Sequence, residues 1–560
     1  MTSTKLWVNK VPNQELFKEF VTQGFFTPLL ARVLINKGFS DIKSAYSFLY
    51  PQLSDFSDPF TIPDMKLAVE RIFKAIKYGE KIGIYGDSDV DGIIGTFVLY
   101  NFLKSLTPNV EWLIPSKEEE GYGFHAKFLP YFKAKGISLI ITVDVGISSY
   151  HTVNSAKALN IDVIITDHHE IIRKPETITI TGKLTSPSSP FYYLCGAGVV
   201  FALIRALRSY LLSQGFFADK EPPFLRKYLE LISLATLADM VPLWGENRLI
   251  TFFGFRDLLN PFFPCTKVLL EKENTKYGLS EEDLYYKIIP KLNSAGRLGK
   301  PEIVFEFLAS LDKTSAEKFF SQIEKLNQER QTLEDEILKS FNYQIKDIPE
   351  NCKFLFLIFE NIPKGMLGLI ANRFKNLYNL PTIVISQEDD TAYGSIRSPS
   401  EINFLNLISQ CKDLLIQFGG HKYALGFKIH KNLITKLKSR LNVLLENHSF
   451  CSYSNQLIYI DAETNLSELL HKENLFAFKS FHPYGEGHLP PTLLLKNFEI
   501  KEITILRDKH SKLILKKEDK ELSAIFFNTL LENKEINYIV GTPFINSFSG
   551  NLELRIEDVR

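Results

Sequence analysis

Three short apolar runs near the start of the chain each end abruptly in acidic residues. Runs of this length and β-branched content are typical of buried strands, and stretches long enough to form helices separate them. This βαβ spacing predicts a parallel sheet, in which the carboxyl ends of all strands lie along one edge. The runs cover residues 82–85, 138–143 and 162–165, and they end in Gly86-Asp87-Ser88-Asp89-Val90-Asp91-Gly92, in Asp144-Val145-Gly146 and in Thr166-Asp167-His168-His169.

The end of the third run carries the strongest chemical signal. The chain has 11 histidines in 560 residues, so the adjacent pair His168 and His169, directly after Asp167, is uncommon. The competing interpretation is a solvated loop with two chance histidines. If the strands are parallel neighbours, the acids of all three ends converge on this pair.

Converging carboxylates repel one another unless a cation lies among them. Oxygen ligands with a few imidazoles suit Mg²⁺ or Mn²⁺ better than zinc. Two such ions, roughly 3.5–4 Å apart, can clamp the attacking and leaving oxygens of a phosphodiester. The sequence therefore predicts a metal-dependent phosphodiesterase site at this edge of the sheet.

The three acidic ends together resemble the first three motifs of the DHH phosphoesterases, in the variant found in RecJ-type single-strand-specific exonucleases. The resemblance continues in the expected order over roughly residues 80 to 560. Its later parts are residues 238–243 and 246–248 as a fourth motif, Gly394-Ser395-Ile396-Arg397-Ser398 and Phe418-Gly419-Gly420-His421 as a DHH-associated domain, and Pro483-Tyr484-Gly485-Glu486-Gly487 as the start of an OB domain.

The resemblance implies roles for individual residues. It implies two Mn²⁺ or Mg²⁺ ions, and it leaves open which histidine of the pair is a ligand. Asp239 would otherwise be interpreted as a cap at the end of an apolar helix. The implied metal ligands are Asp87, Asp89, Asp144, His168 and Asp239, supported by Asp91, Asp167 and His169, and the implied substrate contacts are Lys117, Tyr122, Asn293, Arg297, Arg373, Ser395, Arg397, Ser398 and His421.

Two positions depart from the family pattern. Ser88 stands where the family usually has an aromatic residue, which leaves the acidic ligands intact. Lys117 stands where the family has an arginine. A lysine is a point charge and does not reproduce the two-pronged contact of a guanidinium with phosphate.

With 560 residues and a mass of 64.2 kDa, the chain is too long for a single core. The predicted class is α/β: a parallel-sheet DHH domain, a long connecting helix, a smaller α/β DHH-associated domain and a C-terminal OB-type β-barrel. Residues 289–297 are expected to interrupt the helices of the connector. The predicted segments are an N-terminal segment 1–75, a DHH catalytic domain 76–245, a helical connector 246–348, a DHHA1-like substrate domain 349–450 and an OB-fold domain 451–560.

Several other classes are disfavoured. Residues 121–126 formally fit GxGxxA, but an acidic loop separates them from the preceding strand, unlike a dinucleotide fingerprint. Five widely spaced cysteines without a CxxC pair argue against zinc knuckles and a disulfide framework. No signal peptide or membrane-length apolar run is evident, so we expect a cytoplasmic protein without membrane contact. The net charge of zero gives no indication of a nucleic-acid partner.

These observations predict a metal-dependent 5′→3′ exonuclease that degrades single-stranded DNA to 5′-mononucleotides in recombination and repair. We expect a monomer, with a helicase or a single-strand-binding protein as partner. One alternative is a DHH phosphodiesterase acting on short oligonucleotides or cyclic dinucleotides, although such substrates need no long C-terminal barrel. Another is a catalytically inactive single-strand-binding replication scaffold, although acids are present in every motif.

Overall fold

The three apolar runs lie side by side in one parallel sheet, as predicted. The computed structural model describes residues 5–117, 121–171, 173–273, 279–344, 352–399, 402–445, 457–531, 535–546 and 550–560. The five strands have the order β3-β2-β4-β5-β6, and every neighbouring pair is parallel. They are β2 (Lys81–Gly86), β3 (Val110–Leu113), β4 (Ile137–Val143), β5 (Asp162–Thr166) and β6 (Ile178–Ile180).

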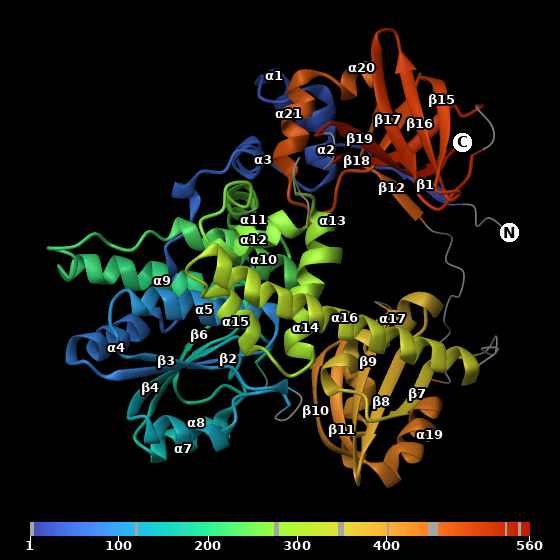
Figure 1. Ribbon diagram of the computed structural model, residues 1–560. Helices are drawn as coiled ribbons and strands as arrows, with labels where there is room; N and C mark the ends of the chain where they lie inside the picture. The colour runs from blue at the N-terminus through green and yellow to red at the C-terminus, as the bar shows by residue number, and fades with distance from the viewer. Residues whose placement is uncertain are drawn as a thin grey trace.

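Helices cover both faces of this sheet (Figure 1). Alternate residues of each strand point to opposite faces, so Ile82 and Ile84 of β2 pack in one core while Tyr85 packs in the other. The first core is shared with α4 (Met65–Tyr78), α5 (Val90–Lys104) and α9 (Gly196–Ser213), and the second with α7 (Leu129–Ala134) and α8 (Tyr150–Ala158).

Among the described residues, α9 is the helix long and apolar enough to span a membrane, but 67% of it is buried inside the protein. Its burial is that of a core helix.

A group of helices follows the sheet: α10 (Leu229–Ala238), α11 (Glu246–Asp257), α12 (Pro264–Lys272), α14 (Ile289–Arg297) and α15 (Glu302–Leu308). The expected interruption at residues 289–297 is wrong, because this segment is itself α14. Its proline lies in the first turn of α14, which runs on directly from a π-helical turn at Leu284–Ile288.

The predicted long amphipathic helix is α16 (Lys313–Gln344). Its first half contributes Phe320 and Ile323 to the core of the first sheet, and its second half contributes Ile337 and Phe341 to the core beneath α17 (Lys364–Tyr378). The helix therefore bridges two bodies of the protein (Figure 1).

The second body is a mixed sheet with the order β10-β11-β9-β8-β7. Only the β7–β8 pair is parallel, and the remaining neighbours are antiparallel. Its strands are β7 (Leu355–Glu360), β8 (Thr382–Glu388), β9 (Thr391–Arg397), β10 (Leu415–His421) and β11 (Ala424–His430), with α17 on one face and α18 (Phe404–Ser409) and α19 (Ile434–Leu445) on the other.

The C-terminal body is a seven-stranded sheet with the order β13-β14-β18-β19-β17-β16-β15. The sequence predicted an OB-type β-barrel here, without a strand order. The strands are β13 (Ala462–Thr464), β14 (Leu493–Lys496), β15 (Glu499–Leu506), β16 (His510–Lys517), β17 (Lys520–Phe526), β18 (Tyr538–Ile545) and β19 (Leu552–Val559).

The two ends of the chain share one core, which the sequence did not indicate. Strand β1 (Leu6–Asn9) pairs in parallel with β12 (Leu457–Ile460). The helices α1 (Gln14–Thr22), α2 (Pro28–Asn36) and α3 (Ile42–Leu49) pack with α20 (Leu466–Leu469), α21 (Lys472–Phe481) and the C-terminal sheet (Figure 1).

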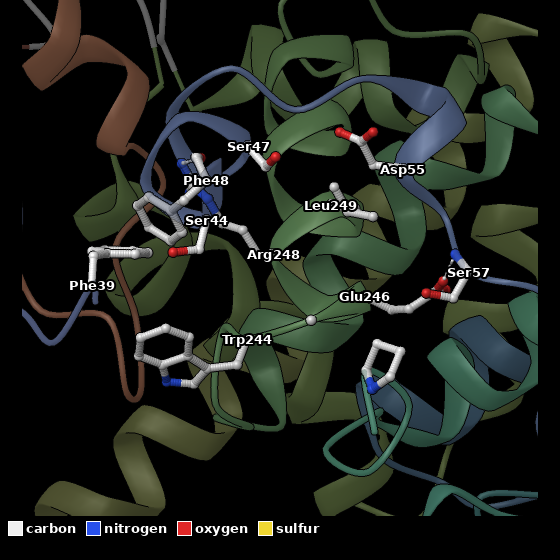
Figure 2. A pocket seen from close by; sticks show the side chains of 12 residues that line it. Phe39, Ser44, Ser47, Phe48, Asp55, Ser57, Trp244, Glu246, Arg248 and Leu249 are labelled. Atoms are coloured by element: carbon white, nitrogen blue, oxygen red, sulfur yellow. Dashed lines mark hydrogen bonds between the residues drawn. The ribbon is translucent and has the colours of Figure 1, made fainter. Parts of the chain in front are cut away.

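A buried arginine joins this composite body to the helices that pack on the first sheet. Arg248 on α11 is 3% exposed, and its guanidinium lies 4.3 Å from the ring centroid of Phe48. Figure 2 shows this joint beside a pocket of about 310 Å³ lined by both bodies, including Phe39 and Trp244. The guanidinium donates hydrogen bonds to the carbonyl oxygens of Ser480 (2.6 Å), Phe481 (3.0 Å), His482 (3.3 Å), Pro483 (3.4 Å) and Phe48 (3.4 Å).

The variant Arg248→Met should be less stable by about 3 kcal/mol, because it leaves buried carbonyl oxygens without donors. Thermal and urea unfolding of the full chain measure this. Arg256→Met on the same helix is the matched control, because the Arg256 guanidinium donates to Phe252 of its own helix. Equal unfolding midpoints for the two variants would contradict the role of Arg248 as a joint.

Candidate metal centre and phosphate-binding residues

The ends of three neighbouring strands bring the predicted acids together. Asp87 follows β2, Asp144 follows β4 and Asp167 follows β5. Asp89 is the N-cap of α5, and its carboxylate accepts a hydrogen bond from the Gly92 amide at 3.1 Å. A carboxylate at this position is stabilised by the helix dipole, which is why the chain turns into a helix here.

His168 is at the centre of the cluster. Its Nε2 lies 3.2 Å from Asp144 Oδ1, 3.4 Å from Asp239 Oδ2 and 3.9 Å from Asp91 Oδ2. Asp239 reaches the cluster from the C-terminal end of α10. Asp144 has a φ of 60°, in the left-handed region that non-glycine residues rarely adopt. Such backbone strain is typical of functional positions.

His169 is fixed by its neighbours. Its Nδ1 lies 2.7 Å from Asp167 Oδ1, and the Tyr122 hydroxyl lies 2.8 Å from its Nε2. The Asp167 carboxylate also accepts hydrogen bonds from the backbone amides of His168, His169 and Ile147. Asp167 therefore sets the conformation of the loop that carries both histidines.

Asp91 has a structural task as well. Its two carboxylate oxygens accept hydrogen bonds from the amides of Gly196 (2.6 Å) and Ala197 (2.8 Å) at the start of α9. Gly196 is required here, because a Cβ at this position would lie 2.5 Å from the Asp144 Cβ. The N-terminus of α9 thereby packs directly against the cluster.

Lys117 supplies a positive charge inside the cluster. Its Nζ lies 2.6 Å from Asp87 Oδ2 and 3.4 Å from Asp89 Oδ2. Although burial opposes it, Lys117 and the Gly92 amide hold the pKa of Asp89 well below its usual range. One lysine does not balance all the acids present.

Several of the other acids in the cluster have raised pKa values, as expected for buried carboxylates without enough positive charge nearby. Burial, reinforced by Asp91 and Asp89, raises the pKa of Asp144 well above its usual range. Burial raises the pKa of Asp239 to about 7 and that of Asp87 to about 6. Burial and the neighbouring His169 lower the pKa of His168 to about 4, so this imidazole is neutral at pH 7 and able to ligate a metal.

The donor set fits divalent cations. Ligand atoms lie within 4.8 Å of one another in three groups, which are Asp144-His168-His169, Asp91-His168-Asp239 and Asp87-Asp89-Asp144. In the described part of the chain, Asp144 Oδ1, His168 Nε2 and Asp239 Oδ2 are buried and form no hydrogen bond, although they face one another at 3.2 and 3.4 Å. Buried polar atoms in proteins normally have partners, so these three indicate a ligand. Carboxylate oxygens with one or two imidazoles suit Mn²⁺ or Mg²⁺.

The raised pKa values predict pH-dependent metal affinity. Asp87 and Asp239 have pKa values of about 6 and about 7, so both must release protons before they ligate a metal. Mn²⁺ affinity should therefore rise between about pH 6 and about pH 8, by up to roughly tenfold per pH unit for each proton released. Calorimetric titration of the full chain with Mn²⁺ at several pH values checks this, and a pH-independent affinity would contradict it.

The stability of the metal-free protein should fall over the same rise in pH, while its affinity for Mn²⁺ increases. A carboxyl with a raised pKa in the folded state binds more protons folded than unfolded, so stability is lost as pH rises through that pKa. The thermal shift caused by Mn²⁺ should accordingly be larger at about pH 8 than at about pH 6.

A second set of residues lies where α14, α16, α17 and β9 meet. The Arg397 guanidinium donates from Nη1 to Ser395 Oγ at 3.0 Å and to the Ile396 carbonyl oxygen at 2.8 Å. Its Nη2 faces α17, where a Cβ at Gly368 would lie 2.5 Å away. Arg297 donates to the carbonyl oxygen of Gly365, also on α17, at 3.0 Å.

These arginines are close enough to repel one another. Burial, followed by the charge of Arg297, lowers the pKa of Arg397 to about 10. Burial and then Arg330 lower the pKa of Arg297. Arg330 on α16 was not among the predicted substrate contacts, and it is 7% exposed. A polar residue on the buried face of an amphipathic helix was the available signal. Arg330 already pairs with Glu334 at 3.0 Å. Arg297 and Arg397 are therefore the guanidinium groups here that are suited to an anion.

The glycine in this segment has a packing role. Gly394, in the stretch that resembles the DHH-associated domain, lies within β9, and a Cβ there would overlap the ring of Phe427. Close packing, not flexibility, explains this glycine.

The other predicted substrate contacts differ in what they touch and in how exposed they are. Asn293 Oδ1 accepts a hydrogen bond from the Val90 amide at 3.1 Å, so it supports the acidic loop. Arg373 is 57% exposed and lies 4.0 Å from Glu334. The Ser398 hydroxyl donates to the Pro399 carbonyl oxygen, and the side chain of His421 lies outside the described residues.

Three family models match the chain in order. Residues 81–236 match the N-terminal domain of the DHH family, residues 351–447 match the DHHA1 domain and residues 460–558 match the RecJ OB domain. All three lie on the separate sheets described above.

Whole-chain comparisons agree. The chain is 31% identical over 537 residues to the single-stranded-DNA-specific exonuclease RecJ of Bacillus subtilis, covering 94% of this chain and 66% of that protein. It is 29% identical over 516 residues to the RecJ of Salmonella typhimurium, covering 87% of this chain and 88% of that protein. The crystal structure of RecJ from Thermus thermophilus in complex with Mn²⁺ matches with a TM-score of 0.82 and 25% identity, covering 100% of this chain and 80% of that chain.

The chain spans about two thirds of the length of the Bacillus subtilis relative and most of the Salmonella one. The order of the matched domains, the similarity along nearly the whole sequence and the fold shared with a manganese-bound RecJ make this chain a member of the RecJ family of DHH phosphoesterases.

Proposed function

We propose that the chain is a metal-dependent 5′→3′ exonuclease that degrades single-stranded DNA to 5′-mononucleotides during DNA recombination and repair. The observation that carries the proposal is the set of unpartnered buried ligand atoms on Asp144, His168 and Asp239. The printed names of the relatives, single-stranded-DNA-specific exonucleases, supply the substrate class.

In this proposal, two Mn²⁺ or Mg²⁺ ions are held by Asp87, Asp89, Asp144, His168 and Asp239. When bound, the ions activate water and stabilise the leaving oxygen of the phosphodiester. Asp167 orients His169, and Asp91 holds the start of α9 against the cluster. Lys117 remains charged beside Asp87 and is placed to attract a phosphate oxygen.

In the same proposal, the 5′-terminal phosphate is bound by Arg397, Ser395 and Arg297. Guanidinium groups whose charges repel one another gain from an anion between them. The C-terminal sheet, matched by the RecJ OB domain, would bind the rest of the strand.

The test uses one sequence in four forms: a linear strand labelled at its 5′ end, the same strand labelled at its 3′ end, a circle and a duplex. With Mn²⁺, the 5′ label should appear at once as a mononucleotide, while the 3′ label shortens gradually. The circle and the blunt duplex should persist. Rapid cutting of the circle or release of the 3′ label first would overturn the proposal.

We also propose that the chain acts as a monomer in the cytoplasm. Because the substrate is single-stranded, a helicase or a single-strand-binding protein is the partner that we expect to present it. Light scattering of the full chain at increasing concentration tests the monomer, and a mass that doubles would contradict it.

A further inference from the structure

Four aromatic rings form a continuous row on the outer side of the body built by the two chain ends. The row runs from Phe25, between α1 and α2, through Tyr46 of α3 and Tyr50, which directly follows α3, to Phe476 of α21. Successive ring centroids lie 6.0, 5.0 and 6.1 Å apart. Segments separated by more than 400 residues thus build one aromatic surface, which we call the aromatic row.

Three of the four rings are exposed, whereas Tyr50 packs partly against the core of this body. Phe25, Tyr46 and Phe476 are 56%, 46% and 63% exposed. The opposite face of α3 already buries Phe48 and Leu49, and Phe48 packs on Arg248 at the joint with the catalytic sheet's helices. Core packing therefore does not account for the outer rings. Contiguous exposed apolar surface of this kind usually marks an interaction site.

Lysines accompany the rings at helical spacing. Lys43 precedes Tyr46 by one turn of α3, and Lys472 and Lys479 lie one turn on either side of Phe476 on α21. All three are exposed. Two acids lie nearby: Glu473 on α21, and Asp41, whose carboxylate is engaged as the N-cap of α3.

We propose that the aromatic row, which helical segments of this body build outside the strands of the C-terminal sheet, is a second binding surface for single-stranded nucleic acid besides the metal centre. Exposed rings in a row, with lysines beside them, are the arrangement that stacks successive bases and attracts phosphates without reading sequence. The inference rests on the proposed function only for the identity of the strand. The row would retain a long strand while its 5′ end is degraded elsewhere.

The test is the triple variant Phe25→Ala, Tyr46→Ala and Phe476→Ala of the full chain. Anisotropy of labelled oligothymidylate is measured in EDTA, which prevents degradation. Binding of a strand of about 50 nucleotides should weaken by about tenfold or more, since stacking on one ring contributes about tenfold or more. The matched control replaces Tyr78, Tyr131 and Phe224, which are 68%, 40% and 57% exposed on other parts of the surface, and should bind normally.

A strand of about 10 nucleotides should bind equally to the variant and the wild type, and its degradation with Mn²⁺ should be unchanged. If the wild type degrades no strand at all, the proposed exonuclease activity fails, while the binding comparison still tests the row. Equal binding of the long strand by the triple variant and the control would overturn the row as a nucleic-acid surface.

Photocrosslinking locates the contact directly. A long strand carrying 5-bromodeoxyuridine should crosslink to peptides that contain Tyr46 or Phe476. Crosslinks confined to the C-terminal sheet and the metal centre would overturn the proposal. If the triple variant binds DNA normally but no longer binds a protein that the wild type binds, the row is a protein-binding surface and the proposal is overturned as well.

Discussion

Replacing Asp144 with asparagine should abolish DNA cleavage while stabilising the metal-free protein at neutral pH. Asp144 follows β4, and its Oδ1 lies 3.2 Å from His168 Nε2. The ions that it would help to hold supply several kcal/mol of transition-state stabilisation. Their loss should lower kcat by about 10³-fold or more, since each 1.36 kcal/mol is about tenfold.

The gain in stability follows from the sign of the pKa shift. Burial and the nearby acids raise the pKa of Asp144 well above its usual range, so its ionised form is disfavoured in the folded, metal-free protein. An asparagine has no charge to bury, so the variant does not have the free-energy cost of holding this acid in the folded, metal-free protein. In differential scanning calorimetry without metal, the Asp144→Asn variant should unfold at a higher temperature than the wild type. Adding Mn²⁺ should raise the unfolding temperature of the variant less than that of the wild type.

Asp219→Asn is the control, because it neutralises an exposed acid outside the cluster. It should leave kcat, the midpoint and the Mn²⁺ shift unchanged. Near-normal turnover by a folded Asp144→Asn variant in Mn²⁺ would remove Asp144 from the site.

The second large effect concerns the 5′ end. Arg397→Ala should slow degradation of 5′-phosphorylated strands by about one to two orders of magnitude. Each hydrogen bond to a charged group contributes roughly 1.5–3 kcal/mol, and about 1.4 kcal/mol is tenfold. The loss on 5′-hydroxyl strands should be smaller, because they lack the terminal charge.

The structure sharpens the expectation for Arg397→Lys. The guanidinium already donates from Nη1 to Ser395 and Ile396, while Nη2 faces Gly368. A lysine ammonium is a point charge that does not reproduce this fork, so it should recover only part of the loss. Because Arg397→Lys keeps the positive charge but removes the planar guanidinium, it separates the contribution of charge from that of hydrogen-bond geometry.

Arg440→Ala is the matched control for this experiment, since Arg440 lies on α19 of the same body and pairs with Asp413 at the surface. It should degrade both kinds of strand at the wild-type rate. An equal loss on phosphate and hydroxyl ends for Arg397→Ala would make Arg397 a general backbone contact. End recognition would then pass to Arg297.

The catalytic half of the fold was predictable because its information is local. Apolar runs of strand length define β2, β4 and β5, and parallel pairing places their carboxyl ends on one edge whatever the intervening helices do. The convergence of Asp87, Asp144 and Asp167 follows from that rule alone. The long amphipathic spacing of α16 was equally local.

Other features depended on contacts between distant segments, which local patterns do not encode. The pairing of β1 with β12 joins the two ends of the chain, and the buried contacts of Arg248 unite α11 with α21. The sequence predicted an interruption of the helices at residues 289–297, whereas the fold makes this segment α14, with its proline in the first turn.

The site shows the same division. The sequence by itself determined that the acids and histidines at the three strand ends meet, because parallel strands emerge at one edge of the sheet, whereas Asp239 was implied only by the family resemblance. Only the tertiary structure decided that Asp91 binds the amides at the start of α9 and that Asn293 supports Val90. It also decided that Asp144, His168 and Asp239 keep unpartnered ligand atoms, because a polar atom's partner is set by which distant backbone packs against it.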